Sequence, residues 1–484
     1  MKKHPYLFLF ALLLLARTVE EPSLHAQTFL KDAFAQRRQR LMDKMDGGIA
    51  IFRSAKVANR NNDVDYEYRQ DSDFYYLTGF EEPESAFLLI PDADKKFVMF
   101  VRPRNRMRET WTGKRFGVKG AMDIYGADTA YTINEFEKIL RRSLTRKEKL
   151  YYSWNDKDFN EKLINMMKQH RSYGPDKIIN PLQYVHEQRL IKSPEEMKLM
   201  RRAIDITREA HTEAMKAAKP GMYEYELEAI IEYIYRKNDS PSPGFPSIVG
   251  SGPNSCILHY EVNNRQTQDG DIIVIDIGAE YGYYSADVTR TIPVSGKFSR
   301  EQRDIYEIVL RAQQEAIDMA APGKGIREIQ NRAVEVVKDG LYRLDLITEK
   351  NSSWQYRIWL MHAISHWLGL DVQDVGSSRG KDERGRILEP GMVFAVEPGI
   401  YVPENVLDDL SELFEHTGLP ATEEEIAEFV ENVKPVAEKY RNIGVRIEDD
   451  VLITEEGHEL LSSKAPRTIE EIERVMREKS HLNF

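Results

Sequence analysis

The stretch DGDIIVIDIGAEYGYYSADVTRTIPV, residues 269–294, decides the fold of the second half of this chain. Apolar runs flank a turn at residues 280–282, a pattern typical of a β-hairpin. Asp276 and Asp287 lie eleven residues apart, and a hairpin of this length can bring both carboxylates to one face of the sheet. A structural alternative places one Asp at a strand end and pairs the other with Arg290.

Three more ionisable residues lie in short apolar stretches: His366 in MHAISHWLG, Glu397 in VFAVEPGIY and Glu448 in GVRIEDDVLIT. Either Glu alone could face solvent from a strand. Together with the two Asp residues they are four carboxylates and one imidazole, and unpaired buried charges cost several kcal/mol. An oxygen-rich set favours Mn, Co or Fe over a thiolate-type zinc centre. Two ions sharing carboxylates could activate water, so the set predicts a hydrolase.

Composition limits the alternatives. The chain has 484 residues, 41% hydrophobic and 30% charged, which is typical of a globular protein of two or three domains. The net charge of -11 argues against a nucleic-acid partner. Cys256 is the only cysteine, which excludes an intrachain disulfide, and a small buried apolar role is expected for it.

The N-terminus reads as a secretory signal peptide, residues 1–26. Lys2 and Lys3 precede the apolar run LFLFALLLLA, residues 7–16, and a small residue, Ala26, precedes the expected cleavage before Gln27. The run is shorter than the ~20 residues of an ordinary membrane span. We therefore expect export, either periplasmic or secreted, with no stable membrane span after cleavage. An uncleaved N-terminal anchor is the alternative.

Two domains are expected after the signal. Residues 27–183 alternate strand-like and helix-like segments, and a break follows near Asn180-Pro181. Ser193-Pro194-Glu195-Glu196 is a helix-start pattern at the head of the second domain, residues 184–484. There a pair of helices followed by strands occurs twice, which indicates an internal duplication. Residues 402–440 form an acidic excursion between two strands.

Longer strings carry a family resemblance: LHY (258–260), MHAISHWLGLDV (361–372), LEPGMVFAVEPGIY (388–401), GVRIEDD (444–450), DSDFYYLTGFEEPESAFLLIPD (71–92) and RPRNRMRETWTGKRFG (102–117). They resemble the pita-bread metallopeptidases, and specifically the Xaa-Pro aminopeptidase (aminopeptidase P) group. The resemblance covers nearly the whole mature chain. It implies an α/β fold, with an N-terminal creatinase/prolidase-like domain followed by an internally duplicated pita-bread domain.

The resemblance also implies a dimetal cage. Asp276 would hold one ion, Asp287 would bridge, and His366 would bind the other. Glu397 and Glu448 would complete the cage around two divalent ions, expected to be Mn(II). A hydroxide between the ions would attack the scissile carbonyl, with Glu397 accepting its proton.

Further roles follow from the same resemblance. His259 and His362 would stabilise the tetrahedral intermediate and help protonate the departing prolyl nitrogen. Arg446 would orient the carboxylates and the substrate, while Tyr401 and Arg384 match positions near the substrate pocket. Other members close a neighbouring subunit's pocket with a tryptophan that Trp111 matches; ordinary core packing is the alternative for Trp111.

One residue departs from the family pattern. Members commonly carry a third histidine in DVHD, where this chain has Gln373 in DVQD, residues 371–374. Gln373 can form hydrogen bonds but carries neither a proton nor a positive charge. Catalysis is expected to survive, with a changed pH dependence or changed contacts to the leaving peptide.

The expected activity is metal-dependent hydrolysis of the N-terminal Xaa-Pro bond of peptides whose second residue is proline, by a homo-oligomer, dimer or tetramer. The nearest rival is a prolidase, which would take only Xaa-Pro dipeptides. A rival of another class is a non-catalytic binding module on the same fold. Such modules typically lose several ligands, whereas all five are present here.

Overall fold

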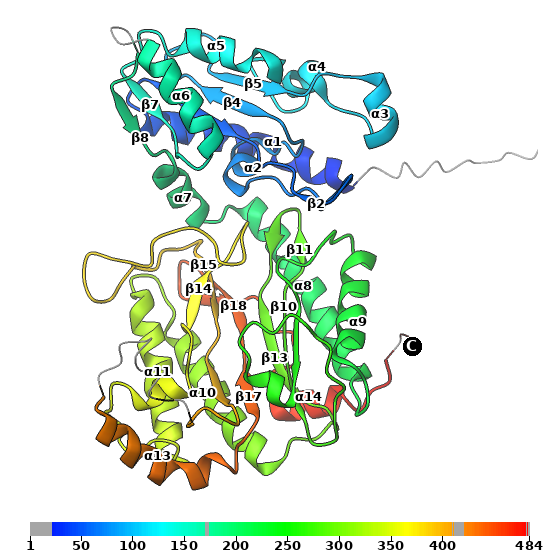
Figure 1. Cartoon of the computed structure of the whole chain (residues 1–484), viewed down its shortest axis with the longest axis vertical. Helices are drawn as coiled ribbons and strands as arrows, with labels where there is room; N and C mark the ends of the chain where they lie inside the picture. The colour runs from blue at the N-terminus through cyan, green and yellow to red at the C-terminus, as the bar shows by residue number, and fades with distance from the viewer. Residues whose placement is uncertain (1–21, 170–173, 409, 411–420, 481, 483–484) are drawn as a thin grey trace, which may run out of the picture.

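The computed structural model describes residues 22–169, 174–408, 410, 421–480 and 482, which form two lobes stacked along the long axis of the molecule (Figure 1). Most of the expected signal peptide, residues 1–21, lies outside the described residues. The first helix, α1 (Pro22–Lys44), crosses the expected cleavage point after Ala26. Among the described residues, no helix combines the length and apolarity needed to cross a bilayer.

The N-terminal lobe is built on a six-stranded mixed sheet of order β6-β5-β4-β1-β7-β8. β1 pairs antiparallel with β4 and parallel with β7. The strands are β1 (Ile49–Arg53), β4 (Ala86–Leu89), β5 (Phe97–Val101), β6 (Thr129–Thr132), β7 (Lys149–Tyr151) and β8 (Lys177–Ile179). A small hairpin, β2 (Asn59–Asn61) with β3 (Val64–Asp65), lies apart from this sheet.

Both faces of this sheet are buried, as β1 shows. Ala50 and Phe52 belong to one apolar cluster, while Ile49 and Ile51 belong to another on the opposite face, because side chains alternate along a strand. The other strands and several helices contribute to these clusters, and the first cluster continues into the C-terminal lobe through residues such as Leu368. The contributing helices are α1, α2 (Ser72–Thr78), α4 (Gly117–Asp123), α5 (Phe136–Ser143) and α6 (Lys157–Gln169). Two further helical segments, α3 (Arg106–Thr112) and η1 (Ile133–Glu135), have no fully buried residue.

The junction between the lobes is helical. α7 (Leu182–Leu190) spans the boundary expected between residues 183 and 184, and it packs against α1 and α2 of the N-terminal lobe. α8 (Pro194–Ala217) then begins as the sequence predicts: the Ser193 hydroxyl accepts a hydrogen bond from the Glu196 N–H, and the Ser193 N–H donates to the Glu196 carboxylate. The boundary expected between residues 183 and 184 falls within α7 and stays a prediction.

The C-terminal lobe repeats one plan twice, which confirms the predicted duplication. The first half is α8, α9 (Glu224–Lys237), β9 (Ile248–Ser251), η2 (Gly252–Cys256), β10 (Ile272–Ile277), β11 (Glu280–Tyr281), β12 (Tyr284–Ser285) and β13 (Val288–Pro293). The second is α10 (Arg300–Met319), α11 (Ile326–Arg343), η3 (Gln355–Ile358), β14 (Ser365–Trp367), β15 (Val393–Val396), β16 (Gly399–Val402), α13 (Glu423–Ala437), β17 (Ile443–Arg446), β18 (Asp449–Ile453) and β19 (His458–Leu460), followed by α14 (Ile469–Val475).

Strands of both halves meet at the centre of the lobe, with the helix pairs α8–α9 and α10–α11 outside them (Figure 1). The first half forms the sheet β13-β10-β9, and the second forms β14-β15-β18-β19 with a separate β16-β17 pair. The Glu448 N–H donates to the Thr289 carbonyl at 3.1 Å, which joins the two halves beside β13. The seam between the halves is therefore where residues of β13 and of the β17–β18 segment lie together.

The hairpin predicted at residues 269–294 is present. β10 and β13 pair antiparallel from Ile272↔Pro293 to Ile277↔Val288. Gly278 follows β10, and a Cβ there would lie 1.9 Å from the Ala286 carbonyl oxygen. Only glycine permits so close an approach of two backbones, and this closeness keeps Asp276 and Asp287 near each other.

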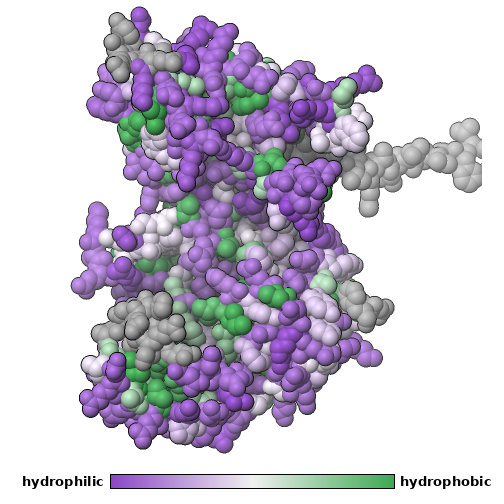
Figure 2. Space-filling model, viewed as in Figure 1, coloured by the Kyte–Doolittle hydropathy of each residue, from purple (hydrophilic) through white to green (hydrophobic). Residues whose placement is uncertain are grey.

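The acidic excursion contains α13, capped by Thr422, whose side chain accepts from the Glu425 N–H. Residues 409 and 411–420 of the excursion lie outside the described residues. On the face shown in Figure 2, polar side chains predominate and apolar residues form small, separate patches.

Candidate metal centre

The five expected ligands come from strand ends along the seam of the duplicated lobe. Asp276 lies near the end of β10, Asp287 directly before β13, His366 within β14, Glu397 directly after β15, and Glu448 between β17 and β18. All are buried or nearly so, and Glu448 is only 1% exposed. The solvent-facing alternative for Glu448 is therefore wrong.

His366 is the centre of the cluster. Its Nε2 lies 3.4 Å from Asp287 Oδ2 and 3.6 Å from both Glu397 Oε1 and Glu448 Oε1. Asp287, His366 and Glu448 each offer a ligand atom within 4.8 Å of the others, a spacing at which one ion could be held. The His366 Nδ1 lies 3.1 Å from the Trp367 carbonyl oxygen. A carbonyl only accepts hydrogen bonds, so Nδ1 carries the proton and Nε2 keeps a lone pair for a metal.

The donor set fits divalent cations, because it is short of positive charge. Asp276 Oδ1, Asp287 Oδ1 and Glu448 Oε1 are buried and have no hydrogen-bond partner among the described residues. The structural alternative for Asp287 is also wrong, since Arg290 pairs with Asp449 at 2.7 Å instead. Buried carboxylate oxygens without partners are costly, and hard divalent ions are the partners such oxygens prefer.

The close packing of these buried carboxylates also raises pKa values in the metal-free centre. Burial, reinforced by Glu448, raises the pKa of Asp287 well above its ordinary value, and the same causes raise the pKa of Glu397 to about 8. Burial opposes a charge on His366, but the nearby carboxylates of Asp287 and Glu448 outweigh burial and raise the pKa of His366. Without metal, the centre therefore retains protons that bound cations would displace.

A chain of hydrogen bonds leads away from the cluster. Arg446 donates through Nη2 to Asp276 Oδ2 at 2.6 Å and through Nη1 to the Tyr401 hydroxyl at 2.8 Å. The Tyr401 hydroxyl lies 2.7 Å from His362 Nε2, while His362 Nδ1 lies 2.8 Å from the Ala363 carbonyl. Tyr401 therefore donates to a neutral imidazole, in agreement with burial and Arg446, which lower the pKa of His362 to about 4.

The structure brings some expected residues to this place and leaves others away. His362 joins the cluster, with Nδ1 3.5 Å from Glu397 Oε2, and His259 lies near enough for its charge to lower the pKa of His362. Gln373 is exposed in the segment after β14. Arg384 is exposed and binds Asp382 on its own loop at 2.8 Å, so it does not reach the cluster in this subunit.

Trp111 is 86% exposed on α3, so the core-packing alternative is wrong. Its contact with a neighbouring subunit stays a prediction. Cys256, by contrast, is buried as expected, and burial raises the pKa of its thiol to about 12.

One supporting residue was missed by sequence reasoning. The Thr289 hydroxyl donates to Glu448 Oε2 at 2.7 Å and lies 3.4 Å from Arg446 Nε. The signal was available: in β13, Thr289 stands two residues after Asp287, so its side chain lies on the same face of the strand.

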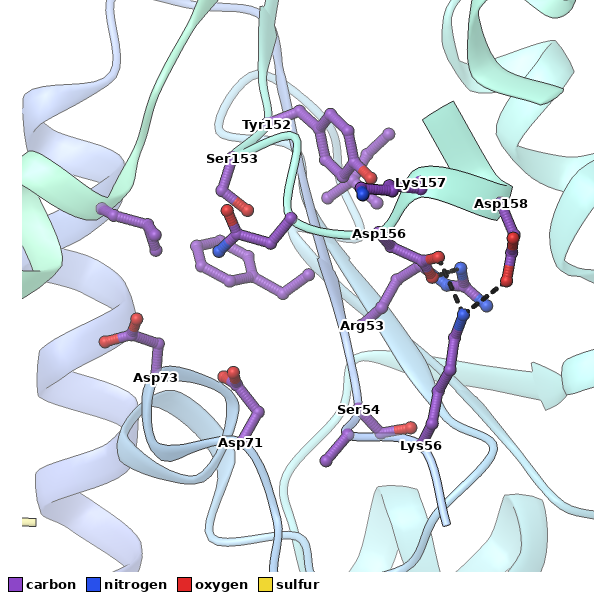
Figure 3. A pocket seen from close by; sticks show the side chains of 15 residues that line it. Arg53, Ser54, Lys56, Asp71, Asp73, Tyr152, Ser153, Asp156, Lys157 and Asp158 are labelled. Carbon is purple, nitrogen blue, oxygen red and sulfur yellow. Dashed lines mark hydrogen bonds and ion pairs between the residues drawn. The ribbon is translucent and has the colours of Figure 1, made fainter. Parts of the chain in front are cut away.

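Two cavities of similar size lie in different lobes of the molecule. One, of about 500 Å³, borders the centre and is lined by His362 together with apolar residues such as Leu360 and Met361. The other, also of about 500 Å³, lies in the N-terminal lobe, with Asp71 and Asp73 on one side and, on the other, Arg53 and Lys56, which pair with Asp156 (Figure 3). None of the described residues that line the second cavity is an expected site residue.

The sequence is similar to known peptidases in both lobes. The model of metallopeptidase family M24 matches residues 198–455, and that of the aminopeptidase P N-terminal domain matches residues 34–151. The chain is 38% identical to the Xaa-Pro aminopeptidase of Haemophilus influenzae, over 92% of this chain and 97% of the relative. It is 39% identical to the Xaa-Pro aminopeptidase of Escherichia coli, over 92% and 98%.

Solved structures agree in fold. The structure of Pseudomonas aeruginosa aminopeptidase PepP superposes with a TM-score of 0.83 at 40% identity, covering 92% of this chain and 98% of that one. Aminopeptidase P from Escherichia coli with the inhibitor Pro-Leu gives a TM-score of 0.83 at 38% identity, over 92% and 98%. The match spans both lobes and the strands that carry the cluster. The chain therefore belongs to metallopeptidase family M24, and its N-terminal lobe is an aminopeptidase P N-terminal domain.

Proposed function

We propose that the chain is a metal-dependent exopeptidase that hydrolyses the N-terminal Xaa-Pro bond of peptides. One observation carries the proposal: five buried metal-ligand side chains, three with unpartnered oxygens, converge in a chain that matches Xaa-Pro aminopeptidases over 92% of its length. A binding module without catalysis would not need an uncompensated carboxylate cluster, because its cost is recovered only when cations bind.

Asp276, Asp287, His366, Glu397 and Glu448 would hold two divalent ions, and we propose Mn(II). The oxygen-rich donor set supports a hard or borderline metal. When bound, such ions polarise a carbonyl and lower the pKa of a water molecule. One solved relative is Zn-substituted Escherichia coli aminopeptidase P in complex with product, so the comparison supports a metal site, and Mn(II) is our proposal.

Separate residues of the chain are suited to proton transfer, to orientation and to hydrogen bonding with the substrate. Glu397 is our candidate to accept and return a proton, because its carboxylate belongs to the cluster and its Oε2 also lies 3.5 Å from His362 Nδ1. Arg446 fixes Asp276 and the Tyr401 hydroxyl, and Tyr401 in turn holds His362 in its neutral form. The Nδ1–H of His362 donates to the Ala363 carbonyl in this structure, and we propose that a substrate oxygen or the departing nitrogen replaces that carbonyl as its partner, without a charge being carried into the site.

Proline sets a special demand on such a site. The Xaa-Pro bond is a tertiary amide without N–H, so a ring-shaped pocket and a proton donor for the ring nitrogen are both required. His362 supports the second role, and the cavity of about 500 Å³ that it lines supplies apolar surface beside the cluster. We propose His259 as the second donor, since its charge reaches His362.

Two further proposals concern the localisation and the oligomeric state of the protein. We propose export, periplasmic or secreted, with residues 1–26 as the signal peptide, on the strength of Lys2, Lys3 and the apolar run 7–16. We also propose a dimer or tetramer, supported by Trp111, which is 86% exposed and matches the tryptophan with which some members of the family close a neighbouring subunit's pocket.

Hydrolysis by the metal-stripped chain beginning at Gln27, with and without added Mn(II), tests the function. The substrates are an Xaa-Pro-Pro tripeptide and an Xaa-Pro dipeptide. Mn(II)-dependent release of the first residue from the tripeptide is the expected result. Cleavage of the dipeptide alone would identify a prolidase, and no cleavage with any divalent ion would overturn the proposal.

A further inference from the structure

An ion cluster centred on the buried Arg189 joins the two lobes. Arg189, in α7, is 2% exposed and contacts three carboxylates. Its Nη1 lies 2.8 Å from Asp73 Oδ1 of the N-terminal lobe, and its Nη2 lies 2.7 Å from Asp371 Oδ2 and 2.5 Å from Asp374 Oδ1 of the peptidase lobe. Lys192 adds a second cation, 3.1 Å from Asp374 Oδ2.

The cluster fixes Asp374 in one position. Burial alone would raise the pKa of Asp374, but Lys192 and Arg189 outweigh it and lower that pKa, so the carboxylate stays ionised. Ser72 adds a further link between the lobes by donating to Asp371 Oδ1 at 2.6 Å. A buried charge held by two cations has little freedom, because moving it would leave charges unpaired.

Asp374 in turn contacts the backbone that orients His366. The Asp374 N–H donates to the Trp367 carbonyl at 2.8 Å, and the His366 Nδ1–H donates to the same carbonyl at 3.1 Å. The position of this one oxygen thus sets the plane of the imidazole and points Nε2 at Asp287. The same turn also holds the hairpin, because the Ser285 N–H donates to the Gly369 carbonyl at 2.9 Å.

We propose that Arg189 is a positioning residue for the metal centre, and that the N-terminal lobe takes part in metal binding through Asp73. The path runs from Asp73 to Arg189, Asp374, the Trp367 carbonyl and His366. Figure 3 shows the Asp73 carboxylate at the edge of the N-terminal cavity, where the path begins. The inference rests on the metal centre of the proposed function, and it assigns a role to residues that touch neither metal nor substrate.

Calorimetric titration of the metal-stripped full chain with Mn(II) tests the proposal without using peptidase activity. Arg189→Gln is expected to weaken Mn(II) binding by about 10- to 100-fold, the usual effect of losing a group that orders a metal ligand. Raising Mn(II) by the same factor should restore turnover. The matched control is Arg386→Gln, because Arg386 binds Glu187 of the same helix at 2.8 Å but is not a partner of Asp374.

Thermal unfolding of the metal-free variants separates folding from metal binding. Asp73→Asn removes one acid at the cluster's edge, and its titration decides the case if Arg189→Gln does not fold. Unchanged Mn(II) affinity in the folded variants, or an equal loss in Arg386→Gln, would overturn the inference. Failure of the unsubstituted chain to bind any Mn(II) would instead overturn the proposed metal centre, and this inference with it.

Discussion

At the scale of single residues, the main feature of the centre is an excess of negative charge that the surrounding protein cations do not balance. Asp287 illustrates this, since its Oδ1 has no partner among the described residues and Glu448 adds to the effect of burial on its pKa. Asp287→Asn keeps the shape and the N–H that donates to Asp450, but loses the charge. We expect peptidase activity to fall by a factor on the order of 10³, about 4 kcal/mol, with Mn(II) binding reduced in parallel.

The same substitution should leave the metal-free fold intact, because it removes the repulsion from Glu448, while the amide oxygen of asparagine can still accept a hydrogen bond from His366 Nε2 in place of the ion pair. Thermal unfolding in chelator checks this point, and the melting temperature should not fall. A variant with undiminished activity would exclude Asp287 as a ligand. A variant that fails to fold would show that its charge has a structural partner.

Tyr401 provides a second prediction at this scale. Its hydroxyl accepts from Arg446 and donates to His362, so Tyr401→Phe leaves two buried polar groups unpaired and should cost about 1–3 kcal/mol of stability. We also expect kcat/KM to fall about 10- to 100-fold. Tyr306→Phe is the control: it too is buried and loses a hydrogen bond, to the Arg467 carbonyl at 2.6 Å, and should lose stability alone.

At the scale of elements, the sequence predicts the hairpin better than the turn after β14. Apolar alternation predicts β10 and β13 and therefore the meeting of Asp276 with Asp287. β14 has three residues, too few for a periodic signal, so His366 is indicated by its apolar surroundings and by the family resemblance and not by a strand pattern. The contact of Arg189 with Asp374 joins residues 185 apart, and no local pattern encodes it, because such contacts depend on how whole lobes pack.

Gln373, the residue that departs from the family pattern, lies in the turn after β14. The contacts of the residues beside it predict the effect of replacing it. Gln373 is exposed, whereas Asp371 and Asp374 on either side bind Arg189. Gln373→His should leave unfolding free energy within about 0.5 kcal/mol, as for most surface substitutions. Mn(II) affinity should be unchanged, and the pH profile of kcat/KM should gain a step near the histidine range. A loss of metal would show that Gln373 supports the cage.

At the scale of the whole molecule, bound metal and pH both affect stability through the same ionisable groups of the cluster. Without metal, Asp287, Glu397 and His366 all have raised pKa values. A group with a raised pKa binds its proton more tightly in the folded than in the unfolded state, so stability rises as pH falls. For Glu397 this window runs from about 8 down to its ordinary 4.5. Burial lowers the pKa of His211 to about 3, which opposes the trend below its ordinary 6.5.

The metal-free chain should therefore gain roughly 1–2 kcal/mol of unfolding free energy between about pH 8 and pH 6.5, from Glu397 alone. Saturating Mn(II) should reverse the sign, because protons then compete with the ions for the same carboxylates. Urea unfolding in chelator and in Mn(II), at both pH values, measures the difference. Glu397→Gln removes one of the competing protons and should reduce the gain in chelator. A metal-free chain that instead loses stability over this range would mean that its buried carboxylates are already neutralised by protein cations, which would remove the physical reason for a metal centre.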